Sequence, residues 1–435
     1  MRGDRPGGLR RRRRGLRRRP PGRRPRRPRR RRPGGPQLPH PLHRGVPFGR
    51  RDRPVRLTEH DPKEITVSVS TTRPEAAPAG YDLNTSAETW RLFWHPVATL
   101  HELREAKPGG RGPLRTTLLG EHIGIAEIGG QVIAFEDRCP HRGVALTLGW
   151  AEDDGLRCRY HGWCFDAAGS CTEIPSMPAD QTKPARAALT KYDCEVRYDL
   201  VWVRLDGSAD TVLPEFEGWS DEAMHCIMGE PYTWPCSSGR RMENFMDVTH
   251  FPFTHQGTLG APPNTVFPVF PMDQYDRRLR WKTETFLAHN PGTDTYGPPV
   301  DETSRMLPPA EYVIEMPFTI TLKFDWSDTF STQIFMHATP IDEVTSRSYW
   351  FTCHTVDGSA DEVHLQLQDM VLGEDLPVVS SHQPPRIGDA AEELSIMPDK
   401  AMILWRRWIR ELDAAAAKGA DALWKVLEKV ELESR

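Results

Sequence analysis

The chain of 435 residues lacks several features that would assign it to common protein classes. No apolar run approaches the roughly eighteen residues that a transmembrane helix needs, so no membrane span is expected. There is no internal repeat, no G-x-G-x-x-G fingerprint between a strand and a helix, and no four-cysteine ferredoxin pattern. The sequence therefore offers no nucleotide-binding or ferredoxin signature of its own. The 8 cysteines are not densely spaced, which favours a reducing cytoplasm and makes metal ligation a better use for them than disulfides.

Charge is distributed unevenly along the chain. Residues 1–60 hold 23 of the 57 basic side chains but only 3 of the 60 acidic ones, so the remainder carries a net charge of −23. The strongly acidic region after residue 60 repels nucleic acid and anionic lipid. A small electron-transfer partner would have to dock on a local patch of basic side chains. The length itself suggests two domains.

The arginine-, proline- and glycine-rich start cannot bury enough apolar surface to fold, so residues 1–80 are predicted to be disordered. One interpretation is a nucleic-acid-binding arm or localisation signal. The preferred one is a non-native segment translated from GC-rich DNA upstream of the true start. No methionine occurs between Met1 and Met177, so Val67 or Val69 are the candidate alternative starts.

Beyond residue 90 the pattern becomes one of short β-strands followed by a mixed region. The segments 115–137 and 194–207 contain apolar runs of strand length between glycine and aspartate turns, which predicts a small antiparallel β domain. Residues 213–230 are expected to be a connector. A helix is predicted around 242–250, long strands over 312–356, and an amphipathic helix over 399–433 with Asp399 as its N-cap.

The first metal-binding pattern is C-x-H-x16-C-x2-H, formed by Cys139, His141, Cys158 and His161. Proline and glycine next to these residues predict two loops, because closely spaced ligands converge only where the backbone turns. Two thiolates and two imidazoles fit a [2Fe-2S] cluster with both cysteines on one iron and both histidines on the other. Structural zinc accepts the same four side chains, so the spacing alone leaves both possibilities open.

The second pattern is N-x-x-D-x-x-H-x4-H, formed by Asn244, Asp247, His250 and His255. Asp247 and His250 are expected on one helix face, and Pro252 is expected to end that helix and return His255 to the same point. Two histidines are part of a 2-His-1-carboxylate iron site.

The third ligand of such a site must come from far along the chain. Asp369, Glu374 and Asp375 are the candidates.

The stretches "CPHRGVAL" and "CRYHGWCFD" resemble the Rieske motif of ring-hydroxylating non-heme iron oxygenases, and the resemblance extends over residues 90–435. It implies an α+β fold: an antiparallel β Rieske [2Fe-2S] domain over 88–206 and a helix-grip (START-like) catalytic domain with mononuclear iron over 207–435. The resemblance to vanillate and dicamba demethylases favours Asp375 as the third iron ligand, beside Glu374.

The same resemblance implies how the two centres cooperate. Asp247 matches a catalytic carboxylate that bridges His250 to the Rieske histidine, His161, of a neighbouring subunit in a homotrimer. The implied activity uses O2, with electrons from NAD(P)H through a separate reductase and in some systems a ferredoxin. It hydroxylates or demethylates an aromatic or heterocyclic small molecule. No partner nucleic acid or membrane is expected.

Two other functions compete with this one. A Rieske electron carrier would lack the second iron, and a zinc protein that binds nucleic acid would use the arginine-rich arm. The apolar and aromatic side chains of residues 315–326 and 331–340 could line a pocket for an apolar ligand but are more simply core. His337, His354 and His382 are each more simply structural than substrate contacts.

Overall fold

The structure is a computed structural model that describes residues 87–256, 258–289, 304–356, 360–387 and 392–432. All of them belong to one compact unit, residues 76–435. The predicted disordered segment 1–80, with Val67 and Val69, lies outside the described residues. In the described ranges, no helix combines the length and apolar character needed to cross a bilayer.

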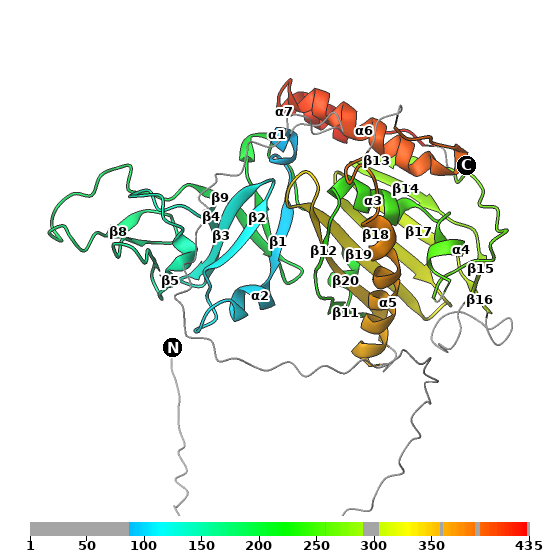
Figure 1. The fold of residues 1–435 in the computed structure, drawn as a ribbon, viewed down its shortest axis with the longest axis horizontal. Helices are drawn as coiled ribbons and strands as arrows, with labels where there is room; N and C mark the ends of the chain where they lie inside the picture. Colours follow the sequence, from blue (N-terminus) through cyan, green and yellow to red (C-terminus); the bar gives the residue numbers. More distant parts are fainter. Residues whose placement is uncertain (1–86, 257, 290–303, 357–359, 388–391, 433–435) are drawn as a thin grey trace, which may run out of the picture. The chain divides into compact units, whose positions relative to one another are not determined.

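The first half of this unit is built on antiparallel strands (Figure 1). A six-stranded sheet has the order β1-β10-β9-β4-β3-β2, and a four-stranded sheet has the order β5-β6-β7-β8. The strands of the larger sheet are β1 (His95–Thr99), β2 (Leu114–Leu118), β3 (Glu121–Ile128), β4 (Gln131–Glu136), β9 (Lys191–Arg197) and β10 (Leu200–Arg204). Those of the smaller sheet are β5 (Trp150–Ala151), β6 (Leu156–Arg157), β7 (Cys164–Phe165) and β8 (Cys171–Glu173). Two short helices, α1 (Ala87–Trp90) and α2 (Leu100–Glu105), flank β1. The predicted β domain is confirmed.

The second half contains an eight-stranded antiparallel sheet. Its strands are β11 (Met224–Met228), β12 (Tyr232–Trp234), β13 (Asp273–Tyr275), β14 (Arg278–Lys282), β17 (Ala310–Glu315), β18 (Thr319–Asp325), β19 (Ser331–Pro340) and β20 (Ser346–Thr355); β15 (Phe286–His289) and β16 (Ser304–Leu307) pair separately. The helices are α3 (Ser238–Met246), α4 (Phe251–Thr254), α5 (Asp361–Val379), α6 (Lys400–Ala416) and α7 (Ala420–Leu427). Helix α5 lies across this sheet, and the predicted α+β class is confirmed (Figure 1).

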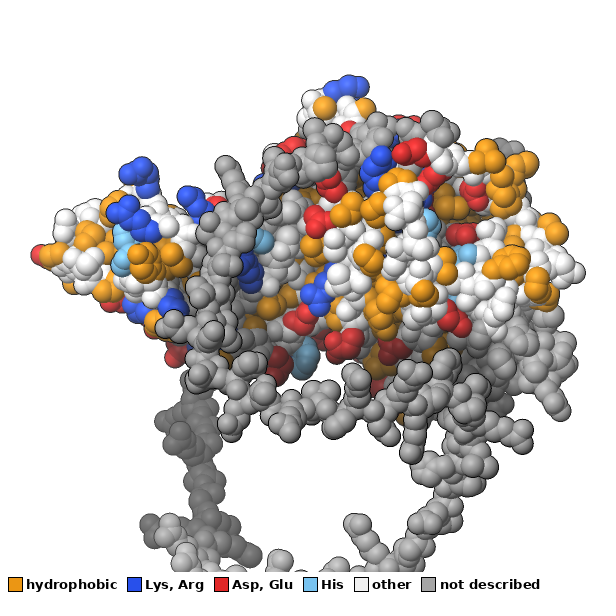
Figure 2. All heavy atoms as spheres, in the orientation of Figure 1, with side chains coloured by type: hydrophobic (Ala, Val, Ile, Leu, Met, Phe, Trp, Pro, Cys, Tyr) orange, Lys and Arg blue, Asp and Glu red, His pale blue; other side chains and the backbone are white. Residues whose placement is uncertain are grey.

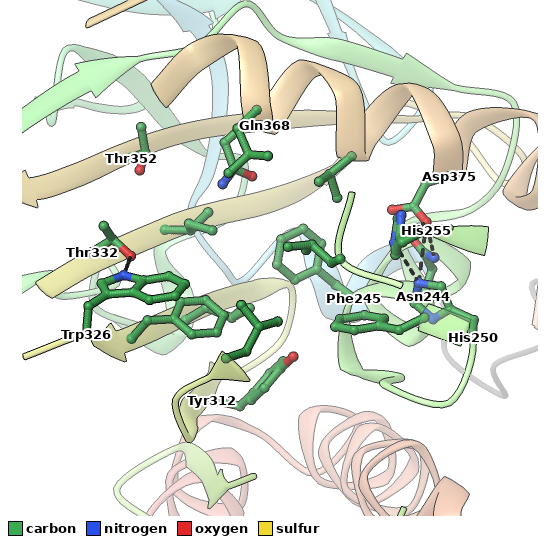
Figure 3. Close-up of a pocket in the computed structure, with 18 residues that line it drawn as sticks. Asn244, Phe245, His250, His255, Tyr312, Trp326, Thr332, Thr352, Gln368 and Asp375 are labelled. Atoms are coloured by element: carbon green, nitrogen blue, oxygen red, sulfur yellow. Dashed lines mark hydrogen bonds and ion pairs between the residues drawn. The ribbon is translucent and has the colours of Figure 1, made fainter. Parts of the chain in front are cut away.

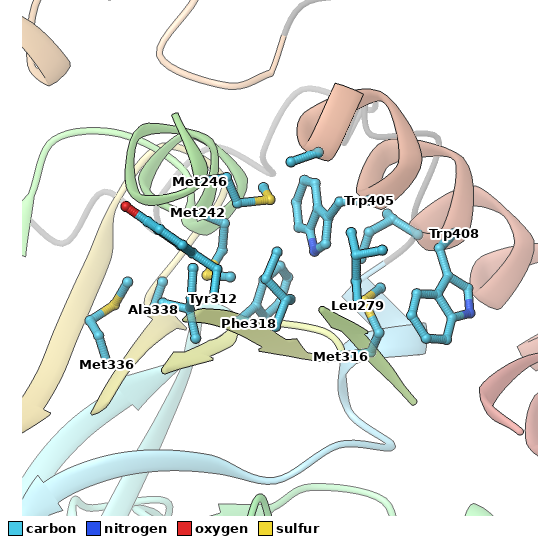
Figure 4. Close-up of a cluster of buried hydrophobic side chains, with 14 of the residues drawn as sticks. Met242, Met246, Leu279, Tyr312, Met316, Phe318, Met336, Ala338, Trp405 and Trp408 are labelled. Atoms are coloured by element: carbon cyan, nitrogen blue, oxygen red, sulfur yellow. The ribbon is translucent and has the colours of Figure 1, made fainter. Parts of the chain in front are cut away.

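The largest core cluster lies between this sheet and helices α3 and α6 (Figure 4). Trp405 and Trp408 of α6 are at most 1% exposed and pack against sheet residues such as Phe318. Both of these α6 indoles have a hydrogen-bond partner, since Trp405 Nε1 donates to the Pro317 carbonyl at 3.0 Å and Trp408 Nε1 to the Val426 carbonyl at 3.1 Å. Burial of a large apolar side chain contributes about 1.5–3 kcal/mol, so this layer anchors the helices that frame the site.

Two local predictions were wrong, and a third was confirmed only in position. The expected connector 213–230 contains strand β11, which pairs with β20. The expected single C-terminal helix is broken at Gly419, whose positive φ of 103° separates α6 from α7. Asp399 stands at the N-cap of α6 but makes no side-chain capping bond there, because its carboxylate accepts from the Ile396 amide at 2.7 Å.

One cysteine pair also differs from expectation. Cys226 of β11 and Cys353 of β20 form a disulfide across the strand pair. The two residues are 127 positions apart, so their proximity depends on tertiary strand pairing, which cysteine spacing does not reveal.

A buried histidine pair connects β1 to β19. The Trp90 carbonyl can only accept, so His95 Nε2 donates to it at 3.0 Å and His95 Nδ1 accepts from His337 Nε2 at 3.1 Å. His337 Nδ1 then accepts from the Thr319 hydroxyl at 2.8 Å. Both rings are neutral in this network. Burial lowers the pKa of His95 to about 4, and burial and the neighbouring His95 lower that of His337 well below its usual value.

This pair predicts acid sensitivity. An unfolded histidine has a pKa near 6.5, so the stabilising contribution of His95 is fully present above about pH 6.5 and is lost as pH falls towards 4. The loss amounts to about 3 kcal/mol for His95 alone. We expect His95→Gln, which does not titrate, to melt at a lower temperature than the native chain at pH 7 but to lose less on going to pH 5. Parallel melting curves across this range would contradict the prediction.

Candidate functional site

Two loops of matching geometry bring together the first set of predicted ligands. In one, the Gly143 amide donates to the Cys139 carbonyl at 2.8 Å; in the other, the Gly162 amide donates to the Cys158 carbonyl at 3.0 Å. Both glycines have positive φ, 72° and 70°, a conformation that L side chains adopt rarely. The turns therefore present one cysteine and one histidine each.

The side chains of these loops form a thiol pair and an imidazole pair. Burial, followed by the neighbouring Cys158, raises the pKa of Cys139 to about 11, so both sulfurs ionise together only beside a cation such as iron. The rings of His141 and His161 lie 4.6 Å apart, and His141 stacks on Trp163 at 4.5 Å. Within the described part of the chain His141 Nδ1 has no hydrogen-bond partner. Partial burial and the nearby His161 and Arg142 lower the pKa of His141, which favours the neutral ring that a metal requires. The donor set fits a [2Fe-2S] cluster.

The second set converges between α3, α4 and α5 (Figure 3). Nε2 of His250 and Nε2 of His255 are 3.1 Å apart, and Oδ1 of Asp375 lies 3.5 Å from the first and 3.3 Å from the second. His255 is 1% exposed and Asp375 is 5% exposed. Three potential ligand atoms thus meet at one point.

The opposite nitrogens of the two histidines face carboxylates. His250 Nδ1 donates to Asp247 Oδ2 at 3.2 Å, and His255 Nδ1 donates to Glu374 Oε2 at 2.9 Å. Because each Nδ1 carries a proton, the two Nε2 atoms can lie 3.1 Å apart only if one of them also holds a proton or a metal cation lies between them. Burial lowers the pKa of His250, but Asp247 and Asp375 outweigh it and raise the value to about 9. The site therefore favours positive charge, and these residues fit a divalent metal.

Asp375 is held ionised by its neighbours. Burial raises its pKa, but hydrogen bonds with His250 and His255 and the charge of Arg241 outweigh burial and place the pKa well below its usual range. Arg241 is fully buried, lies over the Trp234 ring at 4.2 Å, and has its guanidinium nitrogen 3.7 Å from Asp375. Asn244 donates to Asp375 at 3.1 Å. The pattern N-x-x-D indicated Asn244, but nothing in the sequence pointed to Arg241.

The predicted local backbone of this site was wrong. Helix α3 ends at Met246, and Asp247 is its C-cap with extended geometry, so Asp247 and His250 do not share a helix face. Pro252 does not end a helix; it lies in the first turn of α4, where proline is tolerated because its missing amide would be unpaired. The short helix α4 returns His255 to His250.

The three acids that were candidates for the third ligand are separated clearly. Asp375 faces both histidine Nε2 atoms, whereas Glu374 accepts from His255 Nδ1 and from the Thr258 hydroxyl at 2.6 Å. Asp369 accepts from the Tyr232 hydroxyl at 2.9 Å, away from the histidines.

A cavity of about 800 Å³, including its open mouth, adjoins these ligands (Figure 3). Apolar and aromatic side chains line most of it, and they come from α3, α4, α5 and strands β16 to β19. Strands that were expected to be plain core therefore also form part of the pocket wall. Apart from the ligand cluster, Asn244 and Tyr312, three polar side chains line the cavity: Thr332, Thr352 and Gln368. Thr332 accepts from Trp326 Nε1 at 2.9 Å and Thr352 donates to the Gln333 carbonyl at 3.3 Å, whereas Gln368 of α5 points into the cavity (Figure 3). None of His337, His354 and His382 lines this pocket.

Comparison with known proteins agrees with this architecture. Residues 93–193 match the Rieske [2Fe-2S] domain, and residues 234–415 match the vanillate O-demethylase oxygenase C-terminal domain. Methylxanthine N1-demethylase NdmA from Pseudomonas putida is 35% identical over 81% of this chain and 97% of its own length. The chain belongs to the Rieske non-heme iron oxygenases.

Other relatives extend the comparison. Methylxanthine N3-demethylase NdmB from Pseudomonas putida is 37% identical over 76% of this chain and 92% of its own length. The structure of NdmA with caffeine aligns with a TM-score of 0.72 at 35% identity, covering 80% of this chain and 98% of that one. Dicamba monooxygenase with dicamba aligns with a TM-score of 0.60 at 19% identity, covering 77% and 99%, which shows the shared fold.

Family membership decides between the functions left open by the sequence. The oxygenase carries a Rieske cluster and a mononuclear iron and takes electrons from a separate reductase. It oxidises an aromatic or heterocyclic small molecule, with demethylation as the reaction of its relatives. Residues 234–415 match an oxygenase catalytic domain. This match argues against an electron carrier without oxygenase activity and against a zinc protein that binds nucleic acid.

Proposed function

We propose that this oxygenase removes a methyl group from a ring nitrogen of a methylxanthine-like purine. The observation that carries the proposal is the convergence of two imidazole Nε2 atoms and one carboxylate in the lining of a largely apolar cavity. NdmA and NdmB, by name methylxanthine demethylases, support the substrate class. The balanced reaction is R2N–CH3 + O2 + NAD(P)H + H⁺ → R2NH + HCHO + NAD(P)⁺ + H2O.

His250, His255 and Asp375 are proposed to hold the mononuclear iron. When bound, Fe(II) with two histidines and one carboxylate supplies open positions for O2. The chain's own residues set up this site: Asp247 and Glu374 hold the Nδ1 protons, which keeps both Nε2 atoms free to ligate. Arg241 and Asn244 keep Asp375 charged and oriented.

The cavity suits a flat heterocycle with a few polar edges. Apolar walls exclude water from the reacting methyl group, and a small number of placed polar groups fixes orientation. Gln368 offers an amide, which can both donate to a ring carbonyl and accept from a ring N–H. We therefore assign ring recognition to Gln368.

Gln368→Leu tests this assignment. Loss of one hydrogen bond of about 1.5 kcal/mol should raise KM for an N-methylxanthine roughly tenfold, with kcat less affected. Formaldehyde release with a purified reductase and NADH is the measurement. Gln366→Leu, on the exposed side of the same helix, is the matched control and should leave KM unchanged. Absence of formaldehyde from every N-methylated purine tested with the native enzyme would contradict the proposed function.

Cys139, His141, Cys158 and His161 are proposed as the Rieske ligands. His161 is exposed in the single chain, as a histidine that receives or passes electrons across an interface must be. On the face shown in Figure 2, several Lys and Arg side chains lie at the end of the molecule that carries the β5–β8 sheet. Because residues 61–435 carry a net charge of −23, these basic side chains are the proposed docking surface for an acidic reductase or ferredoxin.

A homotrimer is proposed for the assembly. Asp247 and His250 line a groove open to solvent, into which the exposed His161 of a neighbouring subunit could reach. This supports Asp247 as the bridging carboxylate. The domain boundaries 88–206 and 207–435, the absence of nucleic-acid binding and a cytoplasmic location remain predictions.

A further inference from the structure

A second group of potential metal ligands lies at the far end of helix α5 from the iron site. His225 of β11, His354 of β20 and Asp361 of α5 each offer one ligand atom, and these atoms lie within 4.8 Å of one another. Asp361 precedes Asp375 by fourteen residues along the helix, a separation of roughly 21 Å. The group is therefore distinct from the proposed iron ligands.

Strand pairing places the two histidines on one face. His225 and His354 are directly opposite in the β11–β20 ladder, and opposed residues of antiparallel strands project to the same side. Their ring centroids are 5.5 Å apart. His225 Nε2 lies 2.9 Å from Asp361 Oδ1. His225 and Asp361 are exposed whereas His354 is 2% exposed. An ion would therefore enter from solvent past His225 and Asp361 and bind His354 on its buried side.

The buried member is oriented as metal-binding histidines are. His354 Nδ1 donates to the Thr355 carbonyl at 3.0 Å, which leaves Nε2 as the nitrogen with the lone pair. The His354 ring also stacks on His364 of α5, with centroids 3.8 Å apart and planes 13° apart. A backbone carbonyl on the non-ligating nitrogen and a packed ring are the outer contacts that fix a ligand imidazole.

We propose that His225, His354 and Asp361 form a zinc site. Two imidazoles and one carboxylate suit Zn²⁺, with water completing four-coordination. The ion would join β11, β20 and the first turn of α5, three segments that the sequence separates by more than a hundred residues at the widest. Its effect would be to fasten the start of the helix that carries Asp375. This inference is independent of the proposed demethylase activity.

Zinc binding to the iron-loaded enzyme tests the proposal. We expect about one Zn²⁺ per chain to bind with iron retained, measured by elemental analysis after dialysis, and to raise Tm through preferential binding to the folded state. His225→Ala and Asp361→Ala change exposed residues and should each weaken zinc affinity by about 100-fold or more while leaving iron content unchanged.

Two matched variants control for nonspecific binding. His101→Ala removes another exposed histidine, and Glu362→Ala removes the adjacent exposed acid in the first turn of α5. Both should bind zinc as the native enzyme does. The proposal fails if zinc binds only by displacing iron, if no zinc binds beyond the iron site, or if the control variants lose affinity as much as the test variants. Equal loss of affinity in the control variants would show that general surface charge attracts zinc. No zinc beyond the iron site would show that His225 and Asp361 form only an ion pair.

Discussion

Asp375→Asn is expected to lose the mononuclear iron and to abolish substrate oxidation, while the red-brown Rieske chromophore is retained. The neutral amide is a poor ligand for Fe(II), and the two histidine Nε2 atoms would lose the anionic third donor that faces both of them. Iron per chain and the reduced paramagnetic spectrum are the measurements. Because removing this charge also leaves buried Arg241 without its partner, stability should fall by about 3–5 kcal/mol.

Comparison with Glu374→Gln and Asp369→Asn distinguishes an acid that binds the iron from an acid that only orients a histidine ligand. Glu374 holds the His255 Nδ1 proton, so its amide variant should keep iron with affinity lowered about 10–100-fold. Asp369→Asn, on the same helix but bonded to Tyr232, should keep full iron content. Loss of iron in Glu374→Gln and its retention in Asp375→Asn would reverse the assignment of the two acids. The Rieske spectrum reports folding in all three variants.

Asp247→Ala is expected to retain both metal centres but to lose steady-state turnover by about 100-fold. Asp247 accepts from the Thr249 amide at 2.7 Å and the Thr249 hydroxyl at 2.6 Å through Oδ1, which frees Oδ2 for His250. In the proposed trimer this carboxylate also meets His161 of the neighbouring subunit. Its removal should therefore slow electron delivery more than iron binding. The rate at which a prereduced Rieske cluster is reoxidised with substrate and O2 measures that step directly.

Two further variants separate the role of the Asp247 charge from the role of its hydrogen bonds. Asp247→Asn keeps an acceptor for His250 Nδ1 and should retain more iron affinity than alanine but recover little electron transfer, since the charge is absent. Thr249→Val removes only the hydroxyl that fixes Oδ1 and should have a milder effect. Reoxidation at the native rate in Asp247→Ala would show that the electrons take another route.

Much of the fold could be read from local patterns. The strands over 115–137 and 194–207 were predictable because apolar runs between turn residues specify short antiparallel strands, and Gly129–Gly130 does join β3 to β4 with positive φ at both positions. The boundaries around the iron site were not predictable in this way. Pro252 permits either the end of one helix or the first turn of another, and only packing of α4 against α5 decides which.

The sequence by itself indicated the cysteine and histidine candidates for both metal centres, because cysteine and histidine spaced around glycine turns are typical of metal-binding loops. It also determined the net acidity of the region after residue 60. Only the tertiary structure showed that Asp375 faces Nε2 of both histidines whereas the adjacent Glu374 faces Nδ1 of His255. Only the tertiary structure showed that Cys226 pairs with Cys353 and that His225, His354 and Asp361 lie together. Contacts between residues more than a hundred positions apart depend on strand register and helix placement, which local sequence patterns do not reveal.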